Sequence, residues 1–303
     1  ICFTNKGEVI MAIKKVGLQT VKFQNPPSII STYTIVGPKE GEGPLKDYFD
    51  YVLEDDVWGQ ASFEKAEAKI QEETIKAAIT NGNLTNQDID FLLAGDLLNQ
   101  IVSSTYTARQ LSIPYYGLYG ACSTMTESLS LGAMLVDGGF ADKVVCATSS
   151  HFSSAERQFR FPLEYGSQRK FSSQWTVTGA GATILSSTGD GPYITYSTTG
   201  KIVDKGVKDA TNMGGAMAPA AIDTLITHFN DTGFSPSDYD LIISGDLGRV
   251  GKAIVLDLMK KEGYDLSNLF TDCGVEIFDG DKQDTHAGGS GCACAAVVFN
   301  GYI

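Results

Sequence analysis

Residues 88–97 read DIDFLLAGDL and residues 238–247 read DYDLIISGDL, at a constant offset of 150 residues. In both halves a helix-like stretch precedes the block and ends at a glycine, Gly82 or Gly233, which is a common helix stop. A short polar segment and an apolar strand ending in Gly-Asp-Leu follow. Because the blocks and their flanks agree, the sequence indicates an internal duplication.

Strands and helices alternate around these blocks. Small-residue turns open two further helices, one from Gly120 and one from the GGSGCAC run at 288–294. This alternation predicts an α/β sheet rich in parallel strands, with two similar halves and a site between them where the small-residue turns converge. The remaining elements that we expect are helices over 61–80, 125–136 and 216–230, and strands over 113–118, 143–148 and 178–185.

The second half stops short of the repeat. Two strands follow the Cys122 helix in the first half, but no strand follows the corresponding helix before Ile303. We therefore expect a second-half sheet that lacks two strands, and open strand edges there would lower stability. We divide the chain into an added or misassigned start (1–10), an N-terminal half (11–190) and a C-terminal half (191–303).

Composition narrows the classes of partner. The 303 residues include 23 Lys and Arg against 36 Asp and Glu, a net charge of -13. Nucleic acids and anionic membranes attract basic surfaces, so the charge argues against nucleic acid and against unaided binding to such a membrane. The sequence shows no signal peptide and no apolar run long enough to span a membrane.

The six cysteines form no regular disulfide framework, which favours a reducing compartment. Cys292 and Cys294 are too close in sequence for a zinc knuckle, and the nearby His286 does not restore one. The acidic loop over 279–284 lacks the EF-hand pattern. We therefore expect no metal site and no cofactor.

Cys122 is the cysteine best placed for chemistry. It stands in Gly120-Ala121-Cys122-Ser123-Thr124, after a strand-like stretch and at the start of an apolar helix. The free N–H groups and the dipole of a helix start stabilise a thiolate or a ligand carboxylate. The alternative is a buried structural cysteine, which is the usual fate of a free cysteine.

Longer motifs carry a resemblance. Cys122 at a helix start, the strand TGAGATIL and the duplicated halves resemble the thiolase and ketoacyl-synthase superfamily. Within it, the chain resembles the stage V sporulation protein AD family from about Lys14 to Phe299. The resemblance implies a five-layer α/β/α/β/α fold with two pseudo-symmetric halves. The motifs are GPKEGEGPL (37–45), AGDLLNQ (94–100), GACST (120–124), ATSSH (147–151), AERQFRFPLEYG (155–166), MAPAA (217–221) and GGSGCAC (288–294).

The resemblance also implies a function. The family is understood to bind dipicolinic acid (pyridine-2,6-dicarboxylate), free or as its calcium chelate, during uptake into the developing spore. We expect a peripheral protein at the cytoplasmic face of the spore or forespore membrane, beside membrane proteins of the same transport system. A homodimer would form where superfamily members dimerise, near the strand over 113–118. The alternatives are an active Cys122-dependent acyl-transferring or condensing enzyme and a structural subunit of a membrane transport complex.

The catalytic set of a condensing enzyme is incomplete in this chain. Where a synthase places the histidine of an HQAN-like motif, the sequence reads Ser244-Gly245-Asp246. A carboxylate there does not donate to an oxyanion, and it raises the pKa of a nearby cysteine. His286 stands in a stretch that resembles the thiolase H-x-x-G-x-x-G pattern, so it either faces Cys122 or is a loop histidine. We therefore lean towards a binding protein whose Cys122 is only nucleophile-like.

A planar dianion needs donors at both ends and an apolar slot between them. The stretch over 151–170 concentrates basic and aromatic residues, and Arg160, between two phenylalanines, is our first choice for a bidentate carboxylate partner. The predicted ligand-binding residues are Cys122, Ser123, His151, Arg160, Asp96, Asn99, Asp246, His286 and Gly289.

Several of these residues have a structural alternative. Arg157 and Arg169 are expected to pair with nearby glutamates on a surface loop. His151 follows a strand end and either donates to a carboxylate or is a satisfied core histidine. Asp96 and Asp246 end equivalent strands, where each either faces the crevice or caps the helix that follows.

Overall fold

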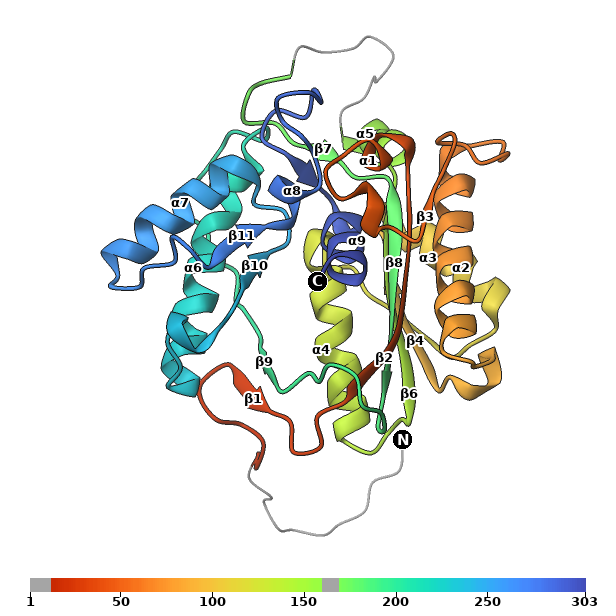
Figure 1. The fold of residues 1–303 in the computed structure, drawn as a ribbon, viewed down its shortest axis with the longest axis horizontal. Coiled ribbons are helices and arrows are strands. Elements are labelled where there is room, and N and C mark those ends of the chain that lie inside the picture. The colour runs from red at the N-terminus through yellow and green to blue at the C-terminus, as the bar shows by residue number, and fades with distance from the viewer. Residues whose placement is uncertain (1–11, 160–168) are drawn as a thin grey trace.

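The computed structural model describes residues 12–159 and 169–303, and it shows a mixed α/β fold in five layers (Figure 1). The predicted α/β/α/β/α fold class is confirmed. From one outer face to the other, the layers are α2 (Phe63–Asn81) with α3 (Val102–Leu111), a six-stranded sheet, α4 (Thr124–Asp137) with α9 (Cys292–Gly301), the strands β10 (Ile242–Ser244) and β11 (Phe270–Asp272), and α6 (Met213–Thr232) with α7 (Gly248–Lys261).

The larger sheet is made of β2 (Ser28–Val36), β3 (Tyr51–Val52), β4 (Phe91–Gly95), β5 (Tyr115–Gly117), β6 (Lys143–Ser150) and β8 (Gly179–Ser186). Its order is β3-β2-β8-β6-β4-β5. β8 is antiparallel to both of its neighbours, whereas β4 runs parallel to β6 and β5. The strand predicted near 113–118 therefore lies at the sheet edge, as expected.

Helix α9 joins the two halves. It belongs to the second half of the sequence but packs against β2, β6 and β8 of the first-half sheet. Glycine on β8 permits the close approach, because a Cβ on Gly181 would lie 2.6 Å from the carbonyl oxygen of Ala296. Almost every residue of α9 is buried, in keeping with a helix that is apolar on all sides.

The internal repeat is present as matching local structure. In each half a long helix is followed by a single 3-10 turn, η2 (Asn86–Asp88) or η6 (Pro236–Asp238), and then by strand β4 or β10. The aspartate that ends each turn accepts hydrogen bonds from the backbone N–H and the hydroxyl of the cap residue, Thr85 or Ser235. The duplication thus extends to the turn chemistry.

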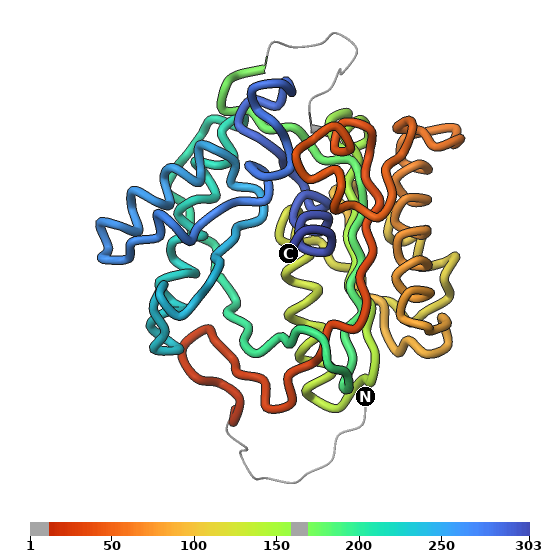
Figure 2. Tube along the Cα trace, in the orientation of Figure 1, coloured from red at the N-terminus to blue at the C-terminus, as the bar shows by residue number. Residues whose placement is uncertain are grey.

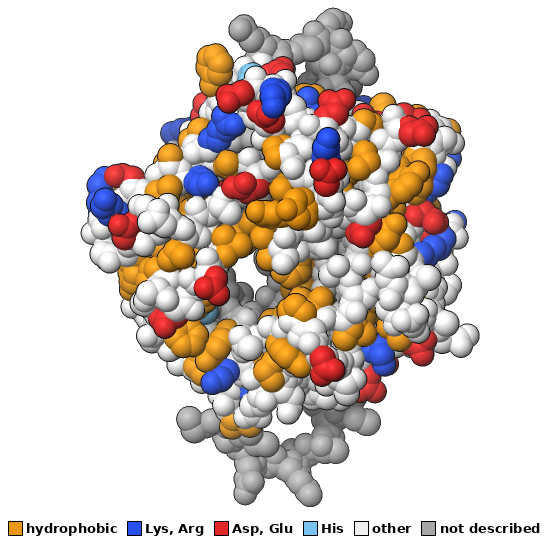
Figure 3. Space-filling view, viewed as in Figure 1, with side chains coloured by type: hydrophobic (Ala, Val, Ile, Leu, Met, Phe, Trp, Pro, Cys, Tyr) orange, Lys and Arg blue, Asp and Glu red, His pale blue; other side chains and the backbone are white. Residues whose placement is uncertain are grey.

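The second-half sheet is much smaller than the first. β10 and β11 form a two-stranded parallel pair within the described residues. All three residues of β10 are half-exposed, whereas four of the five residues of its counterpart β4 are buried. Figure 3 shows a hollow near the middle of one face, with hydrophobic side chains around it. In the same view, Figure 1 places β10 on one side of the hollow and α4 on the other.

Two short strand pairs cross between distant parts of the chain. β1 (Thr20–Lys22) is antiparallel to β9 (Tyr196–Thr198), which brings the start of the described chain beside the second half (Figure 2). β7 (Trp175–Thr176) is parallel to β12 (Gly289–Ser290). The other elements are α1 (Pro38–Gly41), η1 (Lys46–Tyr48), η3 (Asn99–Ile101), η4 (Ala121–Ser123), α5 (Phe152–Phe159) and α8 (Cys273–Glu276).

Candidate ligand site

Cys122 lies in η4, directly before α4, as the sequence predicts. The preceding residue, Ala121, has a φ of 48°, in the left-handed region, so the chain turns sharply there. Cys122 is half-buried, and the carboxylate of Asp246 lies close enough to act on the pKa of its thiol. The cysteine at the start of the first-half helix therefore faces the second half of the molecule.

The carboxylate of Asp246 accepts the hydrogen bonds of this site. Its Oδ2 accepts the Gly291 N–H at 2.9 Å and the Ser290 hydroxyl at 3.3 Å. The same two groups act to lower the pKa of the nearby Cys122 thiol. The result is a network of Cys122, Asp246, Ser290 and Gly291, which we call the Cys122 network. It joins the start of α4 to the start of α9.

The Cys122 network opposes thiolate formation. Burial raises the pKa of Cys122 well above its usual value, and the charge of Asp246 raises it further. Burial also raises the pKa of Asp246 to about 6, although hydrogen bonds from Cys122 and Gly291 act in the opposite direction. The expectation that the helix start stabilises a thiolate is therefore wrong, because burial and the adjacent acid outweigh the helix dipole. The predicted effect of Asp246 on the cysteine is confirmed.

The chain has three histidines, all within the described residues, and each has ring partners other than the Cys122 thiol. The ring of His286 contacts a backbone carbonyl at 2.7 Å and the carboxylate of Asp284 at 3.0 Å. Of the two alternatives, the loop histidine describes His286, because the ring binds the backbone carbonyl of Lys170 and the carboxylate of Asp284 in its own loop. His228 of α6 contacts a threonine and a tyrosine hydroxyl through its two nitrogens.

His151 is fully buried and serves the fold. Its Nδ1 accepts the Ser153 N–H at 3.1 Å, so the ring proton lies on Nε2, which donates to the Asp56 carbonyl at 2.7 Å. The ring of Phe63 lies 5.3 Å away, centroid to centroid, and burial lowers the histidine pKa. His151 is thus the core histidine of the structural alternative, because both of its ring nitrogens are hydrogen-bonded within the protein.

The two equivalent aspartates have different roles. Asp96 accepts the Leu98 N–H at 2.8 Å and the Ser104 N–H at 2.7 Å, so it caps α3. Asp246 does not cap α7. The first amides of that helix are bonded by Asp272 of β11, which leaves the Asp246 carboxylate free to turn towards α9. The capping alternative holds for Asp96 and is wrong for Asp246.

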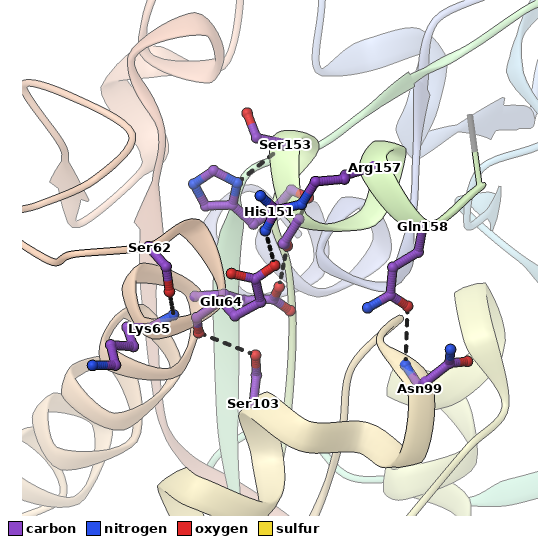
Figure 4. Close-up of polar contacts among 11 residues, drawn as sticks. Ser62, Glu64, Lys65, Asn99, Ser103, His151, Ser153, Arg157 and Gln158 are labelled. Atoms are coloured by element: carbon purple, nitrogen blue, oxygen red, sulfur yellow. Dashed lines mark hydrogen bonds and ion pairs between the residues drawn. The ribbon is translucent and has the colours of Figure 1, made fainter. Parts of the chain in front are cut away.

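Within the basic stretch over 151–170, the described lysine and arginine side chains form ion pairs. Arg157 of α5 reaches Glu64 of α2 (Figure 4), and Arg169 pairs with Asp284 at 2.8 Å. Both were expected to pair with carboxylates, but the partners are more distant in sequence than the nearby glutamates. Arg160, our first choice for the ligand, lies outside the described residues.

Three predicted residues remain to be placed. Asn99 is exposed, and its backbone N–H donates to the side chain of Gln158 at 3.1 Å (Figure 4). Ser123 is exposed, and its hydroxyl donates to the carbonyl of its own turn. Gly289 is buried on β12, and its carbonyl accepts the side-chain amide of Gln174 at 2.7 Å.

Of the predicted residues, Asp246 lies near enough to raise the pKa of Cys122, and Gly289 precedes Ser290 of the same network. Sequence reasoning misses Ser290 and Gly291. The run of small residues over 288–294 could nevertheless have indicated them, because a backbone that carries small side chains can approach another group closely.

A cavity of about 680 Å³ lies elsewhere, between α2 and α3 in the outer layer. Ser62, Glu64 and Ser103, labelled in Figure 4, are among its lining residues, and none of the predicted ligand residues in the described part of the chain is. We therefore assign the site from the chemistry of the Cys122 network, not from the size of an opening.

In residues 12–159 and 169–303, no cluster of three or more His, Cys, Asp or Glu side chains is arranged to hold a metal ion. No helix in these ranges is both long and apolar enough to cross a membrane.

Comparison with known proteins decides the family. Residues 17–303 match the family of stage V sporulation protein AD. Stage V sporulation protein AD of Bacillus subtilis (strain 168) is 47% identical over 291 residues, which cover 96% of this chain and 86% of that relative. The chain belongs to the stage V sporulation protein AD family.

Solved structures place this member of the stage V sporulation protein AD family in the thiolase-like fold. A variant of Xanthomonas campestris OleA, with bound lauric acid and lauroyl-CoA, has a TM-score of 0.63 at 13% identity, covering 92% of this chain and 90% of that one. The 3-oxoacyl-[acyl-carrier-protein] synthase III of Aquifex aeolicus VF5 has a TM-score of 0.54 at 12% identity, covering 90% and 89%. At these identities the likeness concerns the fold alone.

Proposed function

We propose that this chain is a non-catalytic thiolase-fold protein that binds dipicolinic acid, free or as its calcium chelate, and supports its uptake into the developing spore. Membership of a sporulation family supports the setting. The observation that carries the proposal is that Cys122 faces the carboxylate of Asp246 and no histidine.

Acyl transfer would need groups that are engaged otherwise here. A cysteine nucleophile needs a lowered pKa or an adjacent base, and a thioester intermediate needs free N–H donors for its oxyanion. Burial and Asp246 raise the pKa of Cys122, and the Gly291 N–H is already bonded to Asp246. These contacts disfavour the alternative of an active condensing enzyme.

The same groups suit a carboxylate ligand. The start of α9 already holds one carboxylate, since the Gly291 N–H and the Ser290 hydroxyl donate to Asp246, and the start of α4 lies on the opposite side of the Cys122 network. Helix starts of this kind bind carboxylates through backbone N–H groups. We propose that one carboxylate of dipicolinate binds here and that Arg160 contributes to the other end.

The proposed setting is peripheral. A net charge of -13 disfavours direct contact with anionic lipid, so we propose attachment at the cytoplasmic face through the membrane proteins of the same transport system. We further propose a homodimer that pairs along the exposed edge of β5, where Tyr116 is 50% exposed.

A thermal-shift experiment with dipicolinate, calcium dipicolinate and acetyl-CoA tests the function. We expect either form of dipicolinate to raise the melting temperature, because a ligand that binds only the folded state stabilises it. Acetyl-CoA should give no shift and leave Cys122 unacylated. Cys122→Ala should retain most of the dipicolinate shift, since the backbone donors remain.

The other outcomes separate the alternatives. A shift with acetyl-CoA together with turnover of acylated Cys122 would favour the condensing enzyme. A protein that none of the three compounds stabilises would favour the structural subunit.

A further inference from the structure

The carboxylate of Asp246 occupies a position that a bound anion would otherwise fill. It lies at the start of α9, with its Oδ2 2.9 Å from the Gly291 nitrogen, and the residue is only 5% exposed. The Ser290 hydroxyl donates to the same carboxylate at 3.3 Å, and the Cys122 thiol is close enough to act on its pKa. The donors best placed for a ligand carboxylate are therefore already bound to an internal one.

The described surroundings of Asp246 contain no compensating cation. The titratable groups that face it are Cys122 from η4, Asp272 from β11, Cys273 from α8 and Cys294 from α9, and all of them are acids. Among residues 12–159 and 169–303, no Lys, Arg or His side chain forms an ion pair with Asp246. Within these ranges its carboxylate accepts hydrogen bonds from an N–H group and an O–H group.

Asp272 is not able to relieve this charge by moving. Its two oxygens accept the Ser244 hydroxyl and the backbone N–H groups of Leu247, Gly248 and Val275. These contacts hold Asp272 between β11 and the starts of α7 and α8. Any adjustment to an incoming anion therefore falls on Asp246.

Two carboxylates that share one buried site do not both remain ionised, because the second charge raises the pKa of the first. We propose that Asp246 takes up one proton from solvent when a dicarboxylate binds at the Cys122 network, and releases it when the ligand leaves. The protonated Asp246 then donates its O–H to the ligand carboxylate, and the Gly291 N–H becomes available to the ligand. This inference rests on the proposed function. It adds that the site accepts its ligand with Asp246 protonated.

Dipicolinate binding should therefore depend steeply on pH. With a pKa of about 6 for Asp246 in the free protein, roughly one molecule in ten carries this proton at pH 7. Each further rise of one pH unit should weaken dipicolinate binding about tenfold. Asparagine at this position is neutral at every pH, so Asp246→Asn should bind with an affinity that is flat between pH 7 and 8 and tighter than wild type at pH 8.

Calorimetric titration of the full chain with dipicolinate tests this. Repeating the titration at one pH in phosphate and in Tris, which differ in ionisation enthalpy, gives the number of protons taken up. We expect close to one proton per site for wild type and none for Asp246→Asn. The matched control is Glu67→Gln, which removes another buried acid, one that is bonded to Ser149 and Ser154 and not to Asp246, and should leave the proton uptake unchanged.

The outcomes distinguish the two proposals. Binding of dipicolinate by wild type without any dependence on the buffer would overturn the proton uptake and leave the proposed function standing. No binding at any pH would overturn both. Proton uptake that persists in Asp246→Asn would assign the proton to another group and also overturn the inference. The wild-type titration alone decides the main point if the variant does not fold.

Discussion

Two buried glutamates have pKa values that burial raises well above the ordinary value. Glu67 of α2 accepts the hydroxyls of Ser149 and Ser154, and burial, aided by the nearby Asp96, raises its pKa to about 8. Burial also raises the pKa of Glu40 in α1 to about 8. In the unfolded chain both groups would lose their protons near their ordinary value of 4.5. Folding therefore favours proton binding between about pH 4.5 and pH 8.

This predicts stability that falls as the pH rises. The contribution of each glutamate is fully present below pH 4.5 and is lost as the pH rises through the folded pKa of about 8. The loss is at most about 1.4 kcal/mol per pH unit for each group. Glu67→Gln should flatten the dependence, because glutamine cannot ionise while the serine hydroxyls can still bond it. Urea unfolding at pH 5 and pH 8 measures this.

Glu73→Gln on the exposed face of the same helix is the matched control, and we expect it to retain the wild-type slope. If Glu67→Gln and wild type lose the same free energy of unfolding between the two pH values, Glu67 does not hold its proton in the folded state.

At the residue scale, the sequence predicted that Asp246 acts on Cys122 but not what surrounds these two residues. Asp246 was expected to raise the pKa of Cys122, and it does. The orientation of His286 could not be predicted, because it depends on a left-handed φ of 51° and on the carbonyl of Lys170, far away in sequence. The burial of His151 likewise depends on a loop carbonyl, that of Asp56, that no local pattern reveals.

At the scale of single elements, the repeat predicts helix stops at Gly82 and Gly233, and the structure separates the two. Gly233 ends α6 with a φ of 77°, in the left-handed region, whereas Gly82 ends α2 with a φ of −74°. The sequence could not show this difference, because the conformation depends on how the chain leaves each helix.

We therefore expect Gly233→Ala to lower the free energy of unfolding by about 1–2 kcal/mol, since an L side chain is strained in the left-handed region. Gly82→Ala is the matched control and should cost less. Its new Cβ would lie 3.3 Å from a side-chain atom of Leu84, which can shift. Urea unfolding of both variants checks this. Equal losses would show that the left-handed conformation is not what makes Gly233 necessary.

Other elements were predictable to different degrees. The long helices and the buried strands β6 and β8 follow from apolar runs and flanking glycines, and they lie where expected. The two-residue pair of β7 and β12 was not predicted, because so short a pair has no periodicity of its own. It forms where Gln174 bonds the carbonyls of Asp246 and Gly289.

At the scale of the whole molecule, the duplication explains why the layers form two similar halves. The smaller second-half sheet explains why the two halves differ. Each half contributes a sheet and outer helices, while α4 and α9 are buried between the two sheets (Figure 1). The repeat predicted both the pairing of the halves and the smaller second sheet. It did not predict that α9 would pack on the first-half sheet, since which sheet a buried helix joins is decided by packing across the molecule.

The hollow beside β10 has a consequence for motion. Water that reaches the half-exposed Ile242, Ile243 and Ser244 should make local opening of this strand less costly than opening of its buried counterpart β4. We expect the backbone amides of β10 to exchange with deuterium at least about tenfold faster than those of β4, a difference that corresponds to about 1.4 kcal/mol in opening free energy. Mass spectrometry of peptides that cover each strand measures both rates, and equal protection would show that the hollow leaves this part as rigid as the rest. Two copies of one motif then have the same local structure, but the folded state of β10 lasts for a shorter time than that of β4 before it opens. The copy that carries Asp246 is the one that opens first.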